Sequence, residues 1–380
     1  MKVLIVSSSF FPKIDGSTRC VYDHARKLAE RDTVYLATRG IPGTPREQLF
    51  EGIRIRRSSV SFRSGSLLDK AWLVLDQMLQ IIGLQRKHGF DVIHVHGYIS
   101  GLAALPSRYL FRVPLVITTH GTELLWPRNL WWKGQTEVKL GLLFERFVLR
   151  RCDVVIAQSA GVKEYMVRIY GRAIERKIVI VHTGVDHRRF VAPLLTSPSK
   201  SVLFVGALTE VKGVKCLLEA FEMAHQKVPD SKLALVGTGP NAGYYKELVS
   251  KMKLDGTVDF CGPVRDDERL VRLYGESDIV VLPSNVGGPI SCTIMEGLSC
   301  GRAVISTRVP GGIPDVLGGG VGLLMKPEDR SQLASYLMRL MTDARFLDGL
   351  SVNARKAVEE RYTLDSMVDK LSALYMGLAG

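Results

Sequence analysis

The 380-residue sequence lacks any run of about 18 apolar residues, the length that a membrane-spanning helix requires. Its six cysteines are scattered and include no Cys-x-x-Cys pair, which argues against a disulfide framework or a zinc site and favours a reducing compartment. The apolar run at residues 3–6 is too short for the core of a signal peptide and predicts a first β-strand. We therefore expect a globular protein of the cytoplasm, long enough for two domains.

Acidic residues are scarce in the first half of the chain. Residues 1–190 contain 30 Lys and Arg against 16 Asp and Glu, a net charge of +14, whereas residues 191–380 contain 21 against 22, a net charge of −1. A basic half favours an anionic partner, which could be a lipid surface, a phosphorylated acceptor or nucleic acid; a merely solvated basic surface is the alternative. Because no nucleic-acid-reading motif is recognisable, we do not expect nucleic acid.

Short apolar segments alternate with helical patterns along the whole chain. Residues 52–57 alternate apolar and basic side chains, which is typical of an edge strand with one wet face. Ser17 or Thr18 could cap a helix over residues 19–29, and a longer helix is predicted at residues 66–87. Buried strands are predicted at residues 2–7, 33–38, 91–95, 114–118, 152–157 and 177–181, and again at 202–205, 233–236, 258–261, 279–282 and 303–306.

This alternation predicts an α/β fold with two Rossmann-like, doubly wound domains that face each other across a cleft. Residues 187–200 lose the periodicity and contain two prolines, so we expect them to link a domain of residues 1–186 to a domain of residues 201–360. A C-terminal helix, residues 361–380, is expected to pack back on the N-terminal domain.

The segment 278–315 predicts a strand, a glycine-rich loop, a helix over residues 290–299 and a second strand. The free N–H groups of such a helix make an anion site, and Ser291 could cap the helix. Glu296, farther along the helix, could accept two hydroxyl hydrogen bonds. A sugar nucleotide offers a diphosphate for the loop and a ribose diol for the acid, although ordinary α/β packing explains the pattern equally well.

A second phosphate-binding loop is indicated by Lys212, which stands beside a glycine where another helix begins. Without further evidence, a lysine in such a position is more commonly an ordinary surface residue than a phosphate ligand. The glycine turn around Gly237 is a weak signal of the same kind, and the segment 262–265 is a candidate for backbone contacts to a base.

Eleven segments, taken together and in this order, resemble family 4 of the retaining glycosyltransferases, which have the GT-B fold. They are FFPKIDG, DVIHVHG, PLVITTHGTE, CDVVIAQS, IVIVHTGVD, LFVGALTEVKG, LALVGTGP, VDFCGPV, DIVVLPS, IMEGLSCGRAVIST and GGIPD. The resemblance implies a nucleotide-diphosphate-sugar donor on the C-terminal half and an acceptor on the N-terminal half. It also implies retention of configuration, no cofactor and no metal requirement.

The resemblance also implies roles for individual residues. Lys212 would hold the donor diphosphate, Glu296 the ribose hydroxyls, and His120 would face the sugar and the acceptor near the reacting carbon. Gly16 would let the N-terminal loop approach the phosphates closely. We expect His94 and His96 to pack or to line the acceptor cleft, without a chemical role. Further donor-binding positions are Gly206, Gly237, Val264, Arg265, Gly288, Ile290 and Ser291.

Three positions depart from the family pattern. Gly288 stands where the family usually has a glutamate, Ala207 where it usually has an arginine, and Asp15 where it has the first of two glycines. Each of the first two changes could cost about 2–4 kcal/mol of transition-state stabilisation if nothing replaced the group. The candidate replacements for the lost positive charge are Arg265, Arg302 and Arg308. The alternative hypothesis is a catalytically weakened GT-B scaffold that binds a nucleotide or a partner in a glycan-assembly complex.

The N-terminal half, to which the resemblance assigns the acceptor, gives fewer indications of its function. Residues 124–133 carry three of the four tryptophans together with Arg128 and Lys133, which suits either a membrane interface or a lid packed over the cleft. Together with the basic first half and the predicted helix 66–87, they favour peripheral docking to an anionic inner membrane face. The acceptor would then be lipid-linked or part of a cell-surface glycan.

Overall fold

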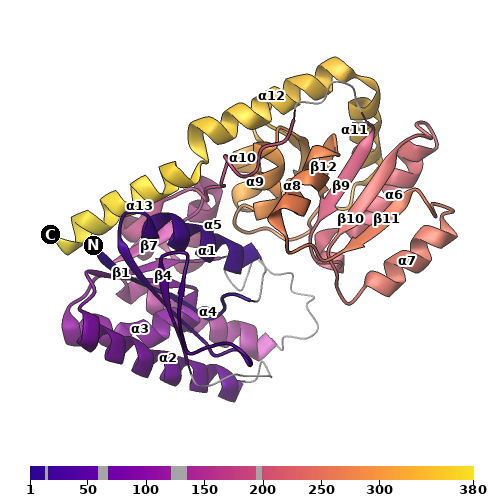
Figure 1. Ribbon diagram of the computed structural model, residues 1–380. Coiled ribbons are helices and arrows are strands. Elements are labelled where there is room, and N and C mark those ends of the chain that lie inside the picture. Colours follow the sequence, from indigo (N-terminus) through magenta and orange to yellow (C-terminus); the bar gives the residue numbers. More distant parts are fainter. Residues whose placement is uncertain (13–15, 59–66, 121–134, 194–198) are drawn as a thin grey trace. The chain divides into compact units, whose positions relative to one another are not determined.

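The computed structural model describes residues 1–12, 16–58, 67–120, 135–193 and 199–380 (Figure 1). The chain forms two compact units. Unit 1 contains Met1–Thr183 together with Leu364–Gly380, and unit 2 contains Gly184–Thr363. Within the described ranges, no helix is long and apolar enough to cross a membrane.

Unit 1 is built on an eight-stranded sheet with the order β3-β4-β2-β1-β5-β6-β7-β8. All neighbouring strands are parallel except β3 and β4. The strands are β1 (Lys2–Ser7), β2 (Thr33–Thr38), β3 (Glu47–Phe50), β4 (Ile53–Arg57), β5 (Val92–His96), β6 (Leu115–Thr118), β7 (Val154–Ala157) and β8 (Ile178–Ile180). The helices are α1 (Gly16–Ala29), α2 (Leu67–His88), α3 (Tyr98–Phe111), α4 (Gln135–Arg151), α5 (Ala160–Tyr170) and the 3-10 helix η1 (Arg172–Lys177).

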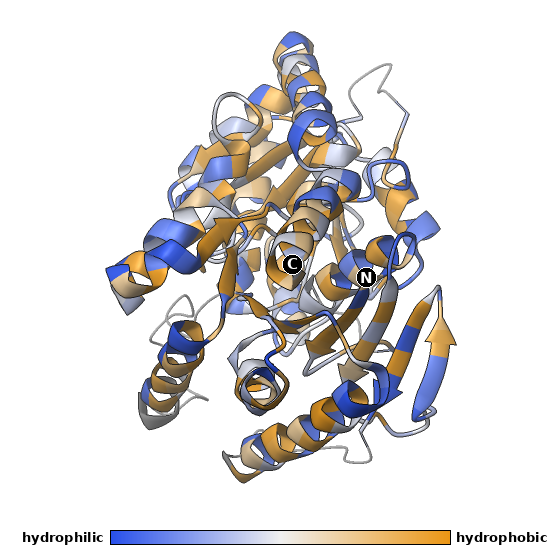
Figure 2. Ribbon diagram, turned by 90° about the vertical axis from the view of Figure 1, so that its left-hand side faces the viewer, coloured by the Kyte–Doolittle hydropathy of each residue, from blue (hydrophilic) through white to orange (hydrophobic). Residues whose placement is uncertain are grey.

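The central strands are continuous apolar runs because helices cover both faces of the sheet (Figure 2).

Two predictions in this unit were wrong. The strand at residues 52–57 has the expected wet face, but it is not an edge, since β4 pairs with β2 on one side and β3 on the other. Helix α1 begins at Gly16, so Ser17 and Thr18 lie inside its first turn and do not precede it. Ser159 caps α5, because its side chain accepts a hydrogen bond from the backbone N–H of Val162 at 3.1 Å.

Unit 2 is built on a six-stranded, wholly parallel sheet with the order β11-β10-β9-β12-β13-β14. The strands are β9 (Ser201–Val205), β10 (Lys232–Val236), β11 (Val258–Gly262), β12 (Ile279–Leu282), β13 (Ala303–Thr307) and β14 (Leu323–Met325). The helices are η2 (Glu210–Lys212), α6 (Val214–His225), α7 (Ala242–Lys251), α8 (Asp267–Gly275), α9 (Cys292–Ser299), α10 (Gly312–Leu317), α11 (Arg330–Thr342) and α12 (Ala344–Arg361).

Each sheet contains one point at which the strand order reverses. In unit 1 the chain runs outward from β1 to β2 and, in the opposite direction, from β5 to β6; in unit 2 the corresponding pair is β9 and β12. In open α/β sheets, ligands bind outside the carboxyl ends of the strands at such a point. We therefore expect ligand-binding sites at the loops after β1, β5, β9 and β12.

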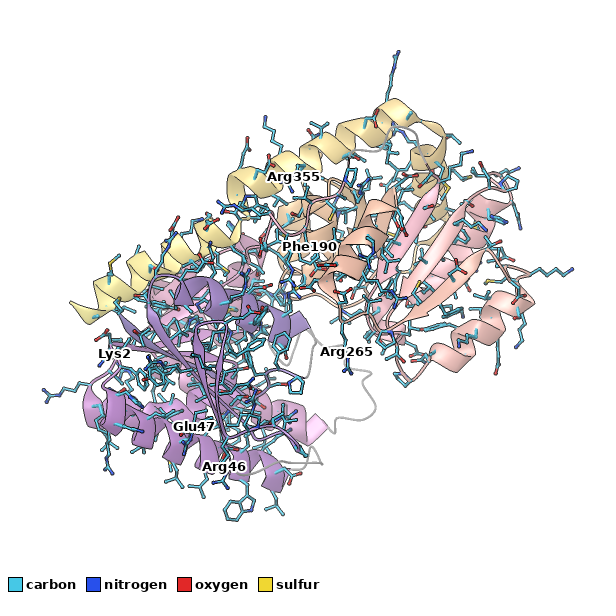
Figure 3. All side chains as sticks on the ribbon, viewed as in Figure 1. Lys2, Arg46, Glu47, Phe190, Arg265 and Arg355 are labelled. Atoms are coloured by element: carbon cyan, nitrogen blue, oxygen red, sulfur yellow. The ribbon has the colours of Figure 1, made fainter. Side chains whose placement is uncertain are left out.

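The segment expected to be a linker is in part anchored in unit 2. Phe190 is 1% exposed and packs edge-to-face on Tyr274, at 6.2 Å between ring centroids. Its carbonyl accepts hydrogen bonds from the side chains of Ser299 at 2.8 Å and Arg355 at 3.3 Å; Phe190 and Arg355 are labelled in Figure 3. Residues 194–198 lie outside the described residues.

The C-terminal helix belongs to unit 1. Helix α12 ends at Arg361 and α13 (Leu364–Ala379) begins after a short break, so the helical segment expected from residue 361 is divided between two helices. Lys27 of α1 makes an ion pair with Asp365 of α13 at 2.8 Å. The buried side of α13 packs with α1 and the strands in one hydrophobic cluster, which includes Leu364, Val368, Leu371 and Tyr375.

Candidate donor site and histidine cluster

The candidate donor site lies at the carboxyl ends of β9 and β12, where the strand order of unit 2 reverses. Gly206 follows β9, and the loop that leads into α9 follows β12. The Thr293 hydroxyl, in the first turn of α9, donates a hydrogen bond to the carbonyl of Val205 at 3.0 Å. This bond fixes the start of α9 beside the end of β9.

The turn that carries Lys212 is fixed to the same place. The carbonyl of Val211 accepts hydrogen bonds from the Ser284 hydroxyl at 3.1 Å and from the backbone of Asn285 at 2.9 Å. The Lys212 side chain is half-buried, and within the described parts of the chain its ammonium group makes no ion pair and no hydrogen bond. Burial lowers the pKa of Lys212, while interaction with Cys292, the first residue of α9, opposes the shift. The structure therefore brings the lysine and the start of this helix together.

The N-terminus of α9 differs from the prediction. Ser291 occupies the N-cap position, with φ −71° and ψ 136°, but its side chain makes no capping hydrogen bond, so the predicted cap is wrong. The helix also begins at Cys292, two residues later than expected, because Ser291 has extended and not helical backbone angles; Ile290 before it is buried in the hydrophobic core. The N–H groups of the first turn thus lack a side-chain acceptor from Ser291.

Glu296 lies in the second turn of α9 and is 6% exposed. Its carboxylate accepts a hydrogen bond from the Tyr274 hydroxyl at 2.9 Å. Burial, and then the neighbouring carboxylate, raise the pKa of Tyr274 well above its usual value, so the phenol stays protonated and remains a donor. Tyr274 comes from α8, and sequence reasoning did not identify it because nothing in the α8 sequence shows which residue faces α9.

Two glycines at this edge of the sheet are required by close backbone contact or by conformation. A Cβ at Gly237, where φ is +135°, would lie 1.9 Å from the carbonyl oxygen of Gly206. Gly288 has φ +145° and forms a bridge with Gly311, although a Cβ there would meet no atom within 4 Å. At Gly288 the backbone conformation, rather than lack of space, disfavours a side chain such as the glutamate expected from the family.

The three arginines considered as replacements lie in different places. Arg302 precedes β13, at the opposite edge of the sheet, and is 1% exposed; it donates a hydrogen bond to the carbonyl of Pro193 at 2.6 Å, so it does not serve the donor site. Arg265 follows β11 with half-buried Val264 before it, and Arg308 follows β13; both arginines are exposed at the carboxyl edge (Figure 3 labels Arg265).

In unit 1, His120 follows the end of β6 and contacts a second histidine. The Nε2 atom of His120 lies 2.8 Å from Nδ1 of His96, and the two rings are stacked at 5.1 Å between centroids. Gly16, the first residue of α1, has open space where a Cβ would be, so nothing in the described part of the chain requires glycine there. Asp15 and the tryptophan-rich segment 124–133 lie outside the described residues.

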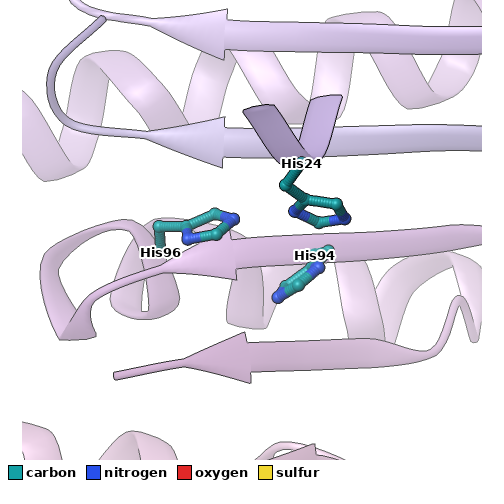
Figure 4. Close-up of side chains that lie close together, drawn as sticks. All are labelled: His24, His94 and His96. Carbon is teal, nitrogen blue, oxygen red and sulfur yellow. The ribbon is translucent and has the colours of Figure 1, made fainter. Parts of the chain in front are cut away.

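His24, His94 and His96 form a buried cluster under this edge (Figure 4). The Tyr375 hydroxyl of α13 lies 2.5 Å from Nδ1 of His94 and 3.2 Å from Nε2 of His24, and the Thr118 hydroxyl lies 2.7 Å from Nε2 of His94. Burial lowers the pKa of all three imidazoles, that of His24 to about 3. The packing role expected for His94 and His96 agrees with this arrangement, whereas His24 and Tyr375 were missed.

The histidine cluster is the one group of three possible metal ligands within the described ranges, and it lines a small cavity with Cys20 and Gln158. Both ring nitrogens of His94 already have hydroxyl neighbours, and the Tyr375 hydroxyl lies between His24 and His94. His94 and one ring nitrogen of His24 therefore belong to a hydrogen-bonded core that holds α13 against β5 and α1.

The chain has two Rossmann-like units with parallel sheets, and the second unit ends in helices that lead back to the first. These features define the GT-B class of fold. Comparison with protein families agrees. Residues 14–189 match the model described as "Glycosyltransferase Family 4", and residues 199–343 match the model described as "Glycosyl transferases group 1". The chain therefore belongs to the family 4 glycosyltransferases.

Similar proteins span the whole chain. An uncharacterized glycosyltransferase of Methanocaldococcus jannaschii is 25% identical over 99% of this chain and 98% of its own length. The N-acetyl-alpha-D-glucosaminyl L-malate synthase of Bacillus anthracis is 24% identical over 98% of this chain and 96% of its own length.

Solved structures show the same fold. The sucrose-phosphate synthase of Thermosynechococcus elongatus superposes with a TM-score of 0.86 at 22% identity, over 99% of this chain and 98% of that chain. Anabaena HepE in complex with UDP-glucose gives a TM-score of 0.76 at 20% identity, over 99% of this chain and 100% of that chain.

Proposed function

We propose that this glycosyltransferase moves a sugar from a nucleotide-diphosphate-sugar donor to an acceptor hydroxyl with retention of configuration. The donor would bind unit 2 at the carboxyl ends of β9 and β12. Its diphosphate would lie between Lys212 and the start of α9, and its ribose diol would bind the carboxylate of Glu296. No metal and no cofactor is required in this scheme.

The observation that carries the proposal is the state of Lys212. A half-buried ammonium group without a carboxylate partner is unfavourable, and its lowered pKa reflects that cost. An anion bound between Lys212 and the first turn of α9 would relieve it, because both the ammonium group and the N–H groups favour negative charge. Glu296 stands one turn farther along the same helix, already oriented by Tyr274.

The same groups suit the chemistry of the transfer. The bond between the anomeric carbon and the phosphate oxygen breaks, and the acceptor oxygen bonds to that carbon on the face that the phosphate leaves. The acceptor proton passes to the departing phosphate. The developing negative charge needs positive charge and N–H donors, which Lys212 and the loop 288–291 provide, with Arg265 and Arg308 as additional cations at this edge.

Unit 1 would bind the acceptor, with His120 facing the sugar near the reacting carbon. The contact of His120 with His96 at 2.8 Å orients its ring and supports this assignment. We propose a lipid-linked acceptor, or one in a cell-surface glycan, because the basic half of the chain suits an anionic inner membrane face.

A catalytically weakened scaffold is the second candidate, and the backbone at Gly288 favours it. With φ at +145°, the loop favours glycine at the position where the family usually has a glutamate, eight residues before Glu296. Such a protein would bind the nucleotide without turnover. Purified protein assayed for transfer and for donor hydrolysis with several donors distinguishes the two: binding without any turnover would support the scaffold.

Donor binding is tested by thermal shift with UDP-, GDP- and ADP-sugars, since a ligand stabilises the native state in proportion to its excess over Kd. UDP is the first choice because structural neighbours were solved with UDP and UDP-glucose. Glu296→Ala should abolish the shift and Lys212→Ala should weaken it. Lys215→Ala is the matched control, because Lys215 is exposed on α6 and pairs with Glu219 at 3.9 Å. An unchanged shift in both site variants would place the donor elsewhere.

A further inference from the structure

Helix α2 has an apolar side that is exposed and that none of the described residues of unit 1 covers. Leu68, Trp72, Leu75 and Leu79 are 74%, 59%, 40% and 61% exposed, and their spacing of four, three and four residues puts them on one side of the helix. The opposite side is buried and includes Gln77, whose amide donates to the carbonyl of Ser7 at 3.3 Å. The usual distribution, with apolar side chains inside and polar ones outside, is thus reversed over part of this helix.

Helix α4 shows the same reversal. Leu143, Phe144 and Phe147 are 62%, 41% and 42% exposed, while Glu145 is 2% exposed and accepts a hydrogen bond from the Tyr170 hydroxyl at 2.5 Å. The hydrogen bond from Tyr170 compensates the burial of this acid, whereas a group of exposed apolar side chains marks a surface that is covered in the working protein.

The two helices belong to one layer. α2 and α4 both pack against α3, and Ile81, Leu105 and Val148 from these three helices share a hydrophobic cluster with the sheet. The helices α1 and α13 cover the opposite face of the sheet, in a separate cluster. The exposed apolar residues of α2 and α4 therefore lie on the same α2–α3–α4 layer of unit 1, which we call the helical face (Figure 1).

The fully exposed charged side chains described on α2 and α4 of the helical face have one sign. They are all cations: Arg86, Lys87, Lys139, Arg146, Arg150 and Arg151. The acids Asp69 and Asp76 are half-buried, and Glu145 is buried. The Arg151 guanidinium lies over the Phe147 ring at 3.7 Å from its centroid, so cations and aromatic rings are interleaved.

We propose that the helical face docks on a membrane surface containing anionic phospholipids. Leu, Trp and Phe side chains flanked by Lys and Arg are the composition of helices that lie in the plane of a bilayer interface. A second copy of this chain fits less well, because a two-fold contact would bring the six cations of one face against those of the other. The inference depends on the surface alone and does not require the proposed donor chemistry.

The test is co-sedimentation of the full chain with vesicles of phosphatidylcholine alone and of phosphatidylcholine mixed with phosphatidylglycerol. We expect binding to the mixed vesicles that weakens with added salt. The double variant Leu79→Gln, Phe147→Gln should reduce the partition coefficient by tenfold or more, because it removes two apolar side chains from the interface. Arg146→Gln and Arg150→Gln should each reduce it on the order of fivefold.

Val352→Gln is the matched control: Val352 is 61% exposed on α12 of unit 2, and the variant should bind like the unchanged protein. Thermal shifts with UDP on the same variants separate this inference from the proposed function, since docking variants should keep whatever shift the unchanged protein shows. Absence of binding to the mixed vesicles, or loss of binding in Val352→Gln as large as in the double variant, would overturn the proposal. A dimer in solution that the double variant dissociates, without vesicle binding, would assign the face to a second copy instead.

Discussion

Acid should destabilise unit 1 through its buried histidines, and His24 gives the sharpest case. Burial, and then the nearby His120, lower the pKa of His24 from 6.5 to about 3. Below pH 6.5 the unfolded chain binds a proton at this position and the native protein does not, so the free energy of unfolding falls as the pH falls toward 3. His94 and His96, which face His24, have pKa values lowered in the same direction and add to the effect.

The size of the effect follows from the pKa difference. With pKa values of 6.5 unfolded and about 3 folded, His24 alone should remove about 2 kcal/mol of stability between pH 7 and pH 5. If all three imidazoles stayed neutral in the native protein, the free energy of unfolding would fall by about 6 kcal/mol between pH 7 and pH 5. A typical domain has a free energy of unfolding of only about 5–15 kcal/mol, so this loss would be a large part of it. Unit 1 should therefore be markedly weaker at pH 5 than at pH 7.

Urea unfolding followed by tryptophan fluorescence measures this, because all four tryptophans lie in residues 1–183 and report on unit 1. The His24→Leu variant loses a hydrogen-bond partner of Tyr375 at every pH, but its stability should change by about 2 kcal/mol less between pH 7 and pH 5 than that of the unchanged protein. An equal pH dependence in the two proteins would refute the reasoning, since it would mean that His24 is protonated in the native state.

Three substitutions test other parts of the structure. Gly213→Ala should lower the free energy of unfolding of unit 2 by more than about 1 kcal/mol in calorimetry, because φ is +70° and the new Cβ would lie 2.0 Å from the Pro283 carbonyl oxygen. Ser159→Ala should cost unit 1 about 1 kcal/mol in urea unfolding through loss of the α5 cap, and Ser159→Asn should recover most of it. Tyr274→Phe should weaken nucleotide binding by removing the donor that orients Glu296, an effect of about 1.5–3 kcal/mol that titration calorimetry would detect; unchanged affinity would contradict that role.

Local patterns predicted most of the strands, and the failures have physical causes. The long apolar strands are evident because a parallel sheet buries both faces. β3 and β14 were missed because they contain only four and three residues, and β3 has half-buried and exposed positions in alternation at the edge of the sheet. The predicted cap at Ser291 failed because residue type favours a cap without ensuring that the side chain turns toward the helix.

The candidate donor site was predictable because its parts are close in sequence or follow strands. Lys212 and Glu296 each come from a contiguous motif whose strand and helix fix their position. The strand direction could also have excluded Arg302, since a residue that precedes a parallel strand lies at the edge opposite to the site. The link between His24 and Tyr375 was not predictable, because 351 residues separate them and only the return of α13 to unit 1 brings them together.

The two proposed functions, active transfer and binding without turnover, make different demands on the loop at Gly288. If transfer occurs, the leaving phosphate must be stabilised without an acid at this position, by Lys212 and by the N–H groups at the start of α9. Transfer should then depend more steeply on Lys212 than donor binding does: Lys212→Ala should reduce kcat by about 10²–10³-fold, the usual consequence of losing one group that stabilises developing charge. Gly288→Glu should not raise the rate, because the backbone at φ +145° disfavours a side chain there. A faster Gly288→Glu enzyme in a transfer assay would show that the loop tolerates the acid and that the native glycine weakens catalysis.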